Sequence, residues 1–312
     1  MNILISGALG HIGSKLIRQI SLNFNKINLD IVDNIATQRY CSIFDLKKNK
    51  NLFINFFDED LLNFDFNKLK KKPSYIIHLA AKTDAESSLY SKNKFISHNY
   101  ALTKKVSDFS LKNNVRLIFI SSTSVYGTQK TTINESCDIQ DLNPQSPYAE
   151  SKIKEENYIK SLSKKGLKYT ILRFGTIYGV SPGIRFHTAV NKFCYQASLN
   201  KPITVWKTAL NQKRPYLYLD DAINSIFFII KNNNFDNEIY NVLTSNNSVK
   251  EIIKIIKIKN NKTKIKFVNS KIMNQLSYNV ENKKLKKLGF KYYGNLKKGV
   301  FEILNLLKGI DN

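Results

Sequence analysis

The chain has 312 residues, 42% of them hydrophobic, so it is long enough to bury one large or two smaller cores and too apolar to be disordered. Its net charge of +25 is carried mainly by lysine, because only six of the 49 basic residues are arginine, the residue that bidentate recognition of phosphates and bases prefers. This argues against a nucleic-acid partner, and since no apolar run approaches the roughly 18 residues of a membrane span, we expect no membrane partner either.

The cysteines and histidines give no sign of a metal site. Cys41, Cys137 and Cys194 are odd in number and far apart, and the four histidines are equally scattered. We therefore expect unpaired thiols in a reducing, cytoplasmic environment and no bound metal.

The N-terminal segment predicts a dinucleotide site. Residues 1–6 form an apolar strand that leads into a glycine turn, Gly7-x-x-Gly10-x-x-Gly13, and then a helical stretch to about Phe24. Glycine here allows a tight turn, lets backbone amides approach a pyrophosphate and lets the helix pack closely on the strand. We assign the residues of this turn to the cofactor: Gly7, Gly10, His11, Ile12 and Gly13.

The second predicted strand, residues 29–33, ends at a carboxylate that selects the cofactor. Asp33 lies 20 residues after Gly13, where a carboxylate hydrogen-bonds the ribose of adenosine and repels the 2′-phosphate of NADP. No arginine lies in the glycine turn or just after Asp33, so NAD is the predicted cofactor. Asn34 is a further candidate contact, and a simple turn role for Asp33 before Asn34 stays open.

Two further strands carry the remaining cofactor candidates. Residues 52–57 form the third strand, closed by Asp58, which either contacts the adenine or caps a helix predicted from Asp60 to Leu69. Residues 75–81 form the fourth strand, whose small end leaves room for a cofactor. We assign that end to the cofactor site: Leu79, Ala80 and Ala81.

The middle of the chain holds the residues expected to carry the chemistry. A helical stretch from about Ser87 to Asn113 is followed by an apolar strand at 117–120 that opens onto hydroxyl residues, Ser122 among them. After a break at 143–147 a helix begins, and Tyr148 and Lys152 lie four residues apart on one of its faces.

This arrangement suits proton abstraction from an alcohol during hydride transfer. A free phenol has a pKa near ~10 and is a poor base at neutral pH, but an adjacent ammonium favours the phenolate. Lys152 therefore makes Tyr148 a usable base, and the Ser122 hydroxyl can hold the substrate oxygen. Four other tyrosines have the same spacing to a lysine, but only Tyr148 opens a helix a loop's length after a strand that ends in hydroxyls.

The alternation of strands and helices, with a sixth strand at 168–173, predicts an α/β fold with a parallel, doubly wound sheet. Residues 180–210 are expected to face the substrate. Arg185, Asn191 and Arg214 are candidate diphosphate ligands, because arginine forks match phosphate oxygens. Trp206 is a candidate stacking partner for a nucleobase. A surface role for the first three and a core role for Trp206 stay open. Amphipathic helices are expected at 252–258 and 296–307.

Taken together, these motifs resemble the extended short-chain dehydrogenase/reductase family, and most closely its nucleotide-sugar epimerase and dehydratase branch. The likeness rests on the glycine turn, Asp33, His78-Leu79-Ala80-Ala81, Asn99, Ser121 to Gly127, Tyr148-x-x-x-Lys152, and Leu172 to Gly179. It continues through Arg214-Pro215-Tyr216, Asp220-Asp221, Tyr240-Asn241-Val242 and Leu288-Gly289-Phe290.

The resemblance implies a Rossmann domain that binds NAD, residues 1–175 with return segments near 215–245, and a smaller, discontinuous C-terminal substrate-binding domain, residues 176–312. It implies that a nucleoside-diphosphate sugar binds between them. It also implies Tyr148 as base, Lys152 on the nicotinamide ribose, Ser122 as hydroxyl partner and Asn99 in a proton relay. A homodimer through the two long helices, near 87–113 and 148–164, is expected.

Departures from the family pattern narrow the reaction. Dehydratases of this branch have Asp-Glu directly after the active-site hydroxyl, where this chain has Thr123 and Ser124, so dehydration is disfavoured. Thr176 stands where many members have asparagine at the diphosphate end of the substrate. We assign these three residues to the substrate. The leading prediction is an NAD-dependent nucleotide-sugar epimerase that works through a keto-sugar. A ketoreductase or decarboxylase of the same family, and more distantly a non-catalytic nucleotide-sensing or RNA-binding protein, stay open.

Overall fold

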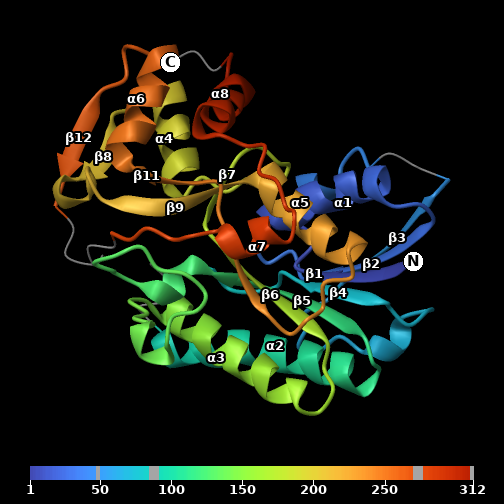
Figure 1. Ribbon diagram of the computed structural model, residues 1–312. Helices are drawn as coiled ribbons and strands as arrows, with labels where there is room; N and C mark the ends of the chain where they lie inside the picture. Colours follow the sequence, from blue (N-terminus) through green and yellow to red (C-terminus); the bar gives the residue numbers. More distant parts are fainter. Residues whose placement is uncertain (47–49, 84–90, 270–276, 310–312) are drawn as a thin grey trace.

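A seven-stranded parallel sheet, with strand order β10-β6-β5-β4-β1-β2-β3, forms the centre of the computed structural model, which describes residues 1–46, 50–83, 91–269 and 277–309 (Figure 1). Its strands are β1 (Asn2–Ser6), β2 (Ile27–Asp33), β3 (Leu52–Asp58), β4 (Tyr75–His78), β5 (Arg116–Ser122), β6 (Tyr169–Phe174) and β10 (Ile239–Val242). The strand order reverses direction between β1 and β4, and this switch point is where doubly wound sheets bind ligands. The predicted fold class is therefore confirmed.

Helices cover both faces of this sheet (Figure 1). Those on one face are α1 (His11–Asn23) and α5 (Leu219–Lys231), and those on the other are α2 (Lys92–Lys112) and α3 (Pro147–Ser163). Because successive strand residues point to opposite faces, Ile3 and Ile5 pack in the first core while Leu4 packs in the second. Strands buried on both faces need a continuous apolar run, which explains why the apolar runs at 1–6 and 117–120 were predicted as strands, whereas β10 was not predicted and the fourth strand ends at His78 and not at Ala81.

The start of α3 is fixed by local chemistry. The Ser146 hydroxyl accepts a hydrogen bond from the Ala149 N–H at 3.2 Å, and Pro147 occupies the first helical turn, where its missing N–H costs nothing. Tyr148 therefore lies in the first turn of α3, at the edge of the sheet where the strands end.

The helix predicted from Asp60 to Leu69 is wrong. The Asp60 carboxylate accepts a hydrogen bond from the Leu62 N–H at 2.8 Å, and Asp65 accepts one from the Asn67 N–H at 2.9 Å, which leaves a turn followed by a short 3-10 segment at Phe66–Lys68. Short acidic side chains compete with a helix by binding the nearby backbone. Asp58 consequently has no helix to cap here.

A smaller layer of helices and two small sheets lies above the large sheet in Figure 1. One small sheet has the order β11-β9-β7 and the other pairs β12 with β8. The strands are β7 (Thr176–Tyr178), β8 (Ile203–Trp206), β9 (Lys213–Tyr218), β11 (Ser245–Ser248) and β12 (Ile265–Val268), and the helices are α4 (Ala189–Ser198), α6 (Val249–Lys259) and α8 (Leu296–Leu306). Helices α6 and α8 are the two amphipathic helices predicted from the sequence, and they share a core with α4.

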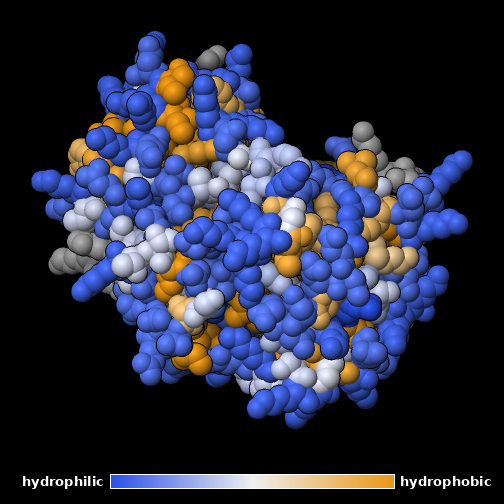
Figure 2. Space-filling view, in the orientation of Figure 1, coloured by the Kyte–Doolittle hydropathy of each residue, from blue (hydrophilic) through white to orange (hydrophobic). Residues whose placement is uncertain are grey.

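Among the described residues the chain returns from this layer to the large sheet twice, first through α5 and β10 and again through α7 (Lys283–Lys287), whose buried Leu285 packs in the first core. After β9 it forms α5 and then β10, which pairs with β6 in parallel, with Ile239 opposite Ile171. Within the described part of the chain, no helix combines the length and apolar character needed to cross a membrane. The visible surface is mostly hydrophilic, in keeping with the lysine-rich sequence (Figure 2).

Candidate active site

The glycine turn between β1 and α1 is packed too tightly at Gly7 and Gly13 for any other residue. Gly7 has a φ of 72°, and a Cβ on it would lie 2.5 Å from the Ala80 nitrogen. A Cβ on Gly13 would lie 2.3 Å from the Ala8 carbonyl oxygen. These two positions therefore need glycine for close backbone approach, and Leu79 and Ala80, which follow β4 together with Ala81, lie directly beside Gly7.

Positive charge gathers around this turn. His11, the first residue of α1, is buried, and its pKa is lowered to about 3 by that burial first and then by the charges of Arg185, Arg39, His187 and Lys15. Its Nδ1 is 2.7 Å from the Ser181 hydroxyl, while its buried Nε2 has no hydrogen-bond partner among the described residues. Cations around a helix N-terminus, whose first backbone N–H groups have no partner within the helix, fit the diphosphate of a dinucleotide.

Asp33 and Asp58 end the neighbouring strands β2 and β3 side by side. The Asp33 carboxylate accepts hydrogen bonds from the Leu9 and Ile35 N–H groups, both at 2.9 Å, so it is held against the glycine turn. Asn34 donates to Asp60 at 3.0 Å. Sequence analysis missed a nearby cation: burial lowers the pKa of Arg39, and the charge of Asp33 acts in the opposite direction.

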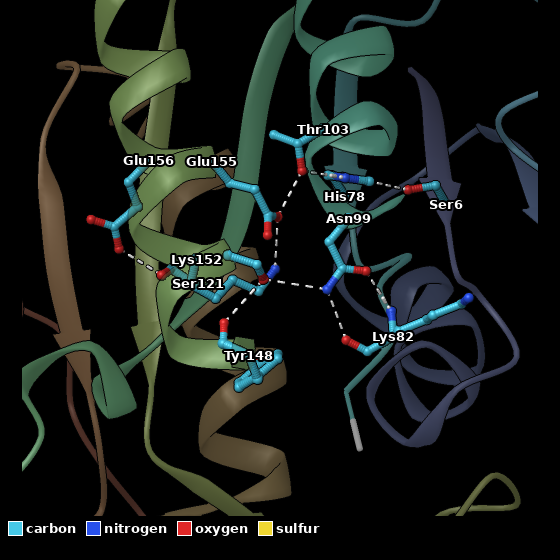
Figure 3. A network of polar contacts seen from close by, with 11 residues as sticks. Ser6, His78, Lys82, Asn99, Thr103, Ser121, Tyr148, Lys152, Glu155 and Glu156 are labelled. Carbon is cyan, nitrogen blue, oxygen red and sulfur yellow. Dashed lines mark hydrogen bonds and ion pairs between the residues drawn. The ribbon is translucent and has the colours of Figure 1, made fainter. Parts of the chain in front are cut away.

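Tyr148 and Lys152 lie together beside β5 (Figure 3). The Lys152 side chain is buried, and its Nζ is 4.6 Å from the centre of the Phe119 ring and 5.9 Å from the centre of the Tyr148 ring. Its ammonium forms an ion pair with Glu155 Oε2 at 3.1 Å. The lysine is therefore held between β5 and the tyrosine by a carboxylate that the sequence analysis did not consider.

The hydroxyl residues after β5 differ in what they contact. Ser122 accepts a hydrogen bond from the Ser124 N–H at 3.1 Å. Buried Thr123 donates to the Phe174 carbonyl at 3.3 Å. The Ser124 hydroxyl is buried without a hydrogen-bond partner among the described residues. Of the three, Thr123 is already used within the fold, while Ser124 keeps an unused donor.

Asn99 on α2 is buried and fixes the segment that follows β4. Its side-chain oxygen accepts from the Lys82 N–H at 2.8 Å, and its amide donates to the Lys82 carbonyl at 2.9 Å and to the Ser151 hydroxyl at 3.3 Å (Figure 3). The two hydrogen bonds to the backbone of Lys82, one residue after Ala81, connect Asn99 to the segment that follows β4. The hydrogen bond to Ser151 connects it to α3.

The substrate candidates outside the large sheet occupy different places. Arg185 donates to the Thr83 hydroxyl and so connects the segment after β7 with the segment after β4. Asn191 is buried, donates to the Arg185 carbonyl at 2.8 Å and accepts from the Gly179 N–H at 3.3 Å, so it shapes the loop that presents Arg185.

Thr176 and Arg214 come from neighbouring strands of the small sheet, β7 and β9. Arg214 also lies near Tyr278. Burial raises the pKa of Tyr278, while a hydrogen bond with Thr123 and the charge of Arg214 oppose that rise, so the substrate candidates Thr123 and Arg214 both affect Tyr278. Trp206 ends β8 in the separate two-stranded sheet.

Sequence analysis also missed the buried ion pair behind the site. Two Arg173 nitrogens donate to the Glu156 carboxylate at 2.9 and 2.6 Å, and Ser121 donates to it at 2.5 Å. Glu156 lies four residues after Lys152 and was detectable by helical spacing, but three glutamates in a lysine-rich helix suggest a solvated face.

With a dinucleotide turn on one side of the switch point and a tyrosine–lysine pair on the other, the fold and the site are those of an extended short-chain dehydrogenase/reductase. A model of the NAD dependent epimerase/dehydratase family matches residues 3–242, and the chain belongs to that family. The predicted family and its cofactor, NAD, are thus confirmed.

Named relatives agree with this class. A UDP-glucose epimerase of Bacillus subtilis, described as uncharacterized, is 29% identical over 74% of this chain and 72% of that protein. A dTDP-D-glucose 4,6-dehydratase of Dictyostelium discoideum is 30% identical over 75% of this chain but 56% of that protein. The crystal structure of UDP-glucuronic acid 4-epimerase from Bacillus cereus, in complex with UDP-glucuronic acid and NAD, superimposes with a TM-score of 0.88 at 25% identity over 99% of each chain. The prediction of an NAD-dependent nucleotide-sugar epimerase is confirmed at the level of this class.

Proposed function

We propose that this protein inverts C4 of UDP-glucuronate by transient oxidation and re-reduction. The observation that carries the proposal is the Tyr148–Lys152 pair, placed beside a strand whose end bears hydroxyls and no carboxylates. Loss of water from the sugar needs an acid and a base at those positions, and the hydroxyls of Thr123 and Ser124 cannot supply them. The pair therefore serves oxidation and re-reduction of C4 without loss of water.

Each residue of the site has a definite task. NAD, held by the glycine turn and Asp33, would supply a hydride acceptor for C4 and then a hydride donor to the opposite face of the sugar. The Tyr148 phenolate removes the C4 hydroxyl proton, is a neutral phenol while the keto-sugar exists, and later returns the proton; the Lys152 ammonium stabilises the phenolate before the first step and after the last. The Ser122 hydroxyl holds the reacting oxygen. Asp33 binds the adenosine ribose, and the glycine turn receives the diphosphate of the cofactor.

A hexuronate is the substrate that these surroundings favour. Its carboxylate needs donors and positive charge, and the buried Ser124 hydroxyl and the Thr176 hydroxyl are near the edge where β5 and β6 end. Arg185 adds a cation on the loop after β7. The bound ligand of the Bacillus cereus enzyme supports the same choice. Arg214 is the proposed ligand of the UDP diphosphate, and Trp206 the proposed stacking partner of its base.

The organisation of the chain follows from this proposal. Residues 1–175 with the return segment near 215–245 form the NAD domain, and residues 176–312 otherwise form the substrate domain. We further propose a cytoplasmic homodimer through α2 and α3.

The test is to incubate the purified protein with NAD and, separately, UDP-glucuronate, UDP-glucose and dTDP-glucose. The expected result is a C4 stereoisomer of UDP-glucuronate with the total of oxidised NAD unchanged. Conversion of UDP-glucose instead would move the proposal to a neutral hexose. Release of carbon dioxide, or loss of water from dTDP-glucose, would contradict it.

A further inference from the structure

We propose that Glu155 is a positioning residue for the tyrosine base: its buried carboxylate, the acceptor at the end of a chain of hydrogen bonds from Ser6, keeps the Lys152 ammonium charged and in place beside Tyr148. The proposal deepens the proposed function and rests on it for the role of Tyr148. The contacts that carry it are shown in Figure 3.

This chain of hydrogen bonds connects two strands, β1 and β4, with two helices, α2 and α3, through the core. The Ser6 hydroxyl is 2.7 Å from His78 Nδ1, His78 Nε2 is 3.1 Å from the Thr103 hydroxyl, and Thr103 donates to Glu155 Oε2 at 2.8 Å. Lys152 donates to the same oxygen at 3.1 Å. Ser6 precedes the glycine turn directly, so the chain runs from the cofactor turn to the lysine.

The donor and acceptor of each hydrogen bond in this chain follow from Glu155, the acceptor at its end. Burial, and then the charge of Lys152, lower the pKa of His78 to about 3, so its imidazole is neutral and has one donor and one acceptor. Since the Thr103 hydroxyl donates to Glu155, its oxygen accepts from His78 Nε2, and Nδ1 is left to accept from Ser6. All the donors thus point toward Glu155.

This direction requires Glu155 to be a carboxylate. Its Oε2 accepts two hydrogen bonds, and its Oε1 is buried with no acceptor or donor beside it among the described residues. A proton on Oε1 would have nowhere to point, whereas the charge on Oε2 has an ammonium as partner. Because only Oε2 of Glu155 accepts hydrogen bonds, the carboxylate contributes little to holding the fold together, and its main contact is the ion pair with Lys152.

Lys152 depends on this charge because it is almost fully buried, with 3% of its surface exposed. Burial favours the neutral amine, by as much as roughly 3–5 pH units for a fully buried lysine without a partner. A neutral amine no longer favours the phenolate of Tyr148. Of the three donors of the ammonium, Glu155 takes one, and the others remain for the tyrosine and the ribose.

The other charges near Lys152 do not replace Glu155. From β4 it faces the neutral His78, from β5 the ring of Phe119 and on its own helix the ring of Tyr148. The α2 residues that reach this part of α3, Thr103 through Glu155 and Asn99 through Ser151, are uncharged. The next carboxylate, Glu156, is committed to Arg173 of β6. Glu155 is therefore the single carboxylate that contacts Lys152 among the described residues.

The direct test follows the charge of Lys152 in the NAD-free protein. The side-chain NMR signal of Lys152, identified by its absence in Lys152→Met, is titrated with pH in the unmutated protein and in Glu155→Gln. The Gln variant keeps size and hydrogen bonding but removes the charge. Its Lys152 signal should titrate at least ~1 pH unit lower than in the unmutated protein. Equal midpoints overturn the proposal.

Glu156→Gln is the matched control. It removes a carboxylate of equal burial one residue further along α3, which pairs with Arg173 and not with Lys152. This variant should lose stability while leaving the Lys152 midpoint where it is. A shift as large as that of Glu155→Gln would mean that any lost core charge has the same effect, and would refute the assignment.

A second readout uses the reaction. In Glu155→Gln the acid limb of the pH profile of kcat/KM should move to higher pH by about one unit, and Glu155→Asp should restore part of that shift. An unmoved limb contradicts the proposal. If the unmutated protein epimerises no nucleotide sugar, the proposed function fails, but the NMR titration still decides the role of Glu155.

A double variant covers the case in which Glu155→Gln does not fold. Lys152→Met leaves Glu155 buried without its partner, which is strongly destabilising. If the carboxylate serves the ammonium, Lys152→Met with Glu155→Gln should melt at a higher temperature than Lys152→Met alone. A double variant that is equally stable or less stable overturns the proposal.

Discussion

Tyr148 and Tyr100 each precede a lysine by four residues on a helix, yet their surroundings differ. Lys152 is buried between β5 and the Tyr148 ring, whereas Lys104 lies at the surface and pairs with Asp108. The Tyr100 ring instead packs edge-on against Tyr158. Equal spacing thus places a buried ammonium beside the ring in one case, and in the other an exposed ammonium that pairs with a carboxylate.

Replacing the two tyrosines separates these roles. Tyr148→Phe should lower turnover by about 10²- to 10⁴-fold, the usual effect of losing a general base, with NAD affinity unchanged. Tyr100→Phe should change thermal stability only. Turnover and NAD titration of both variants provide the measurement, and equal losses of turnover would show that Tyr148 is not the base.

Cofactor choice is a second prediction at this scale. A carboxylate at Asp33 repels a 2′-phosphate, so NAD should bind at least about tenfold more tightly than NADP, and Asp33→Ala should narrow the gap. Arg39 lies close enough to Asp33 to interact with its charge, and without that carboxylate Arg39 is the cation that would bind the 2′-phosphate of NADP. Arg39→Ala should therefore weaken NADP more than NAD in the Asp33→Ala background. Equal affinities for the two cofactors in the unmutated protein would exclude the selective role of Asp33.

At the scale of elements, the turn between β1 and α1 contains its own matched pair of substitutions. A Cβ on Gly13 would meet the Ala8 carbonyl oxygen at 2.3 Å, but on Gly10 the nearest atom is the Gly7 oxygen at 3.4 Å. Gly13→Ala should cost about 1–3 kcal/mol of unfolding free energy, and Gly10→Ala should be close to neutral. Urea unfolding of the NAD-free variants measures both. Similar losses of unfolding free energy in the two variants would mean that the close contact with the Ala8 carbonyl is not the reason why residue 13 must be glycine.

Helices and strands whose apolar residues follow a regular spacing could be predicted from the sequence. Segments whose conformation depends on local hydrogen bonds between side chains and backbone could not. Strands such as β6, buried at all six positions, were readable as apolar runs. The segment from Asp60 was misread because its acids bind their own backbone, and a pattern of apolar spacing contains no record of that competition.

The same limit explains the site. Tyr148, Lys152 and the glycine turn have fixed spacings along the chain, so they could be proposed from sequence. Glu155 could not, because its role depends on Thr103 and His78, which reach it from α2 and β4. Likewise the contact of Asn191 with the Arg185 carbonyl is a property of the folded loop.

At the scale of the whole molecule, two buried histidines should make the protein sensitive to acid. Burial, the largest cause, lowers the pKa of both His11 and His78 from 6.5 to about 3, so the unfolded chain binds more protons between those pH values. The contribution of the two neutral histidines to the free energy of unfolding is complete above pH 6.5 and is lost as the pH falls toward 3. Each should remove about 1.4 kcal/mol of unfolding free energy per pH unit within that window.

Urea unfolding at a series of pH values measures this slope. His78→Gln should flatten it by about the share of one histidine. His98, which is partly exposed, provides the control, and His98→Gln should flatten it less. A His78→Gln slope identical to that of the unmutated protein would contradict the prediction.

The pairing of β10 with β6 has a consequence for how the protein is made. Residues 239–242 are synthesised long after residues 169–174, so a growing chain leaves β6 as the edge of an unfinished sheet while the intervening segment is still being translated. All six residues of β6 are buried in the finished fold, and an exposed apolar edge is a template for aggregation. Nascent chains that stop before residue 239 should therefore need a chaperone, and the large sheet should gain its full stability only after β10 leaves the ribosome.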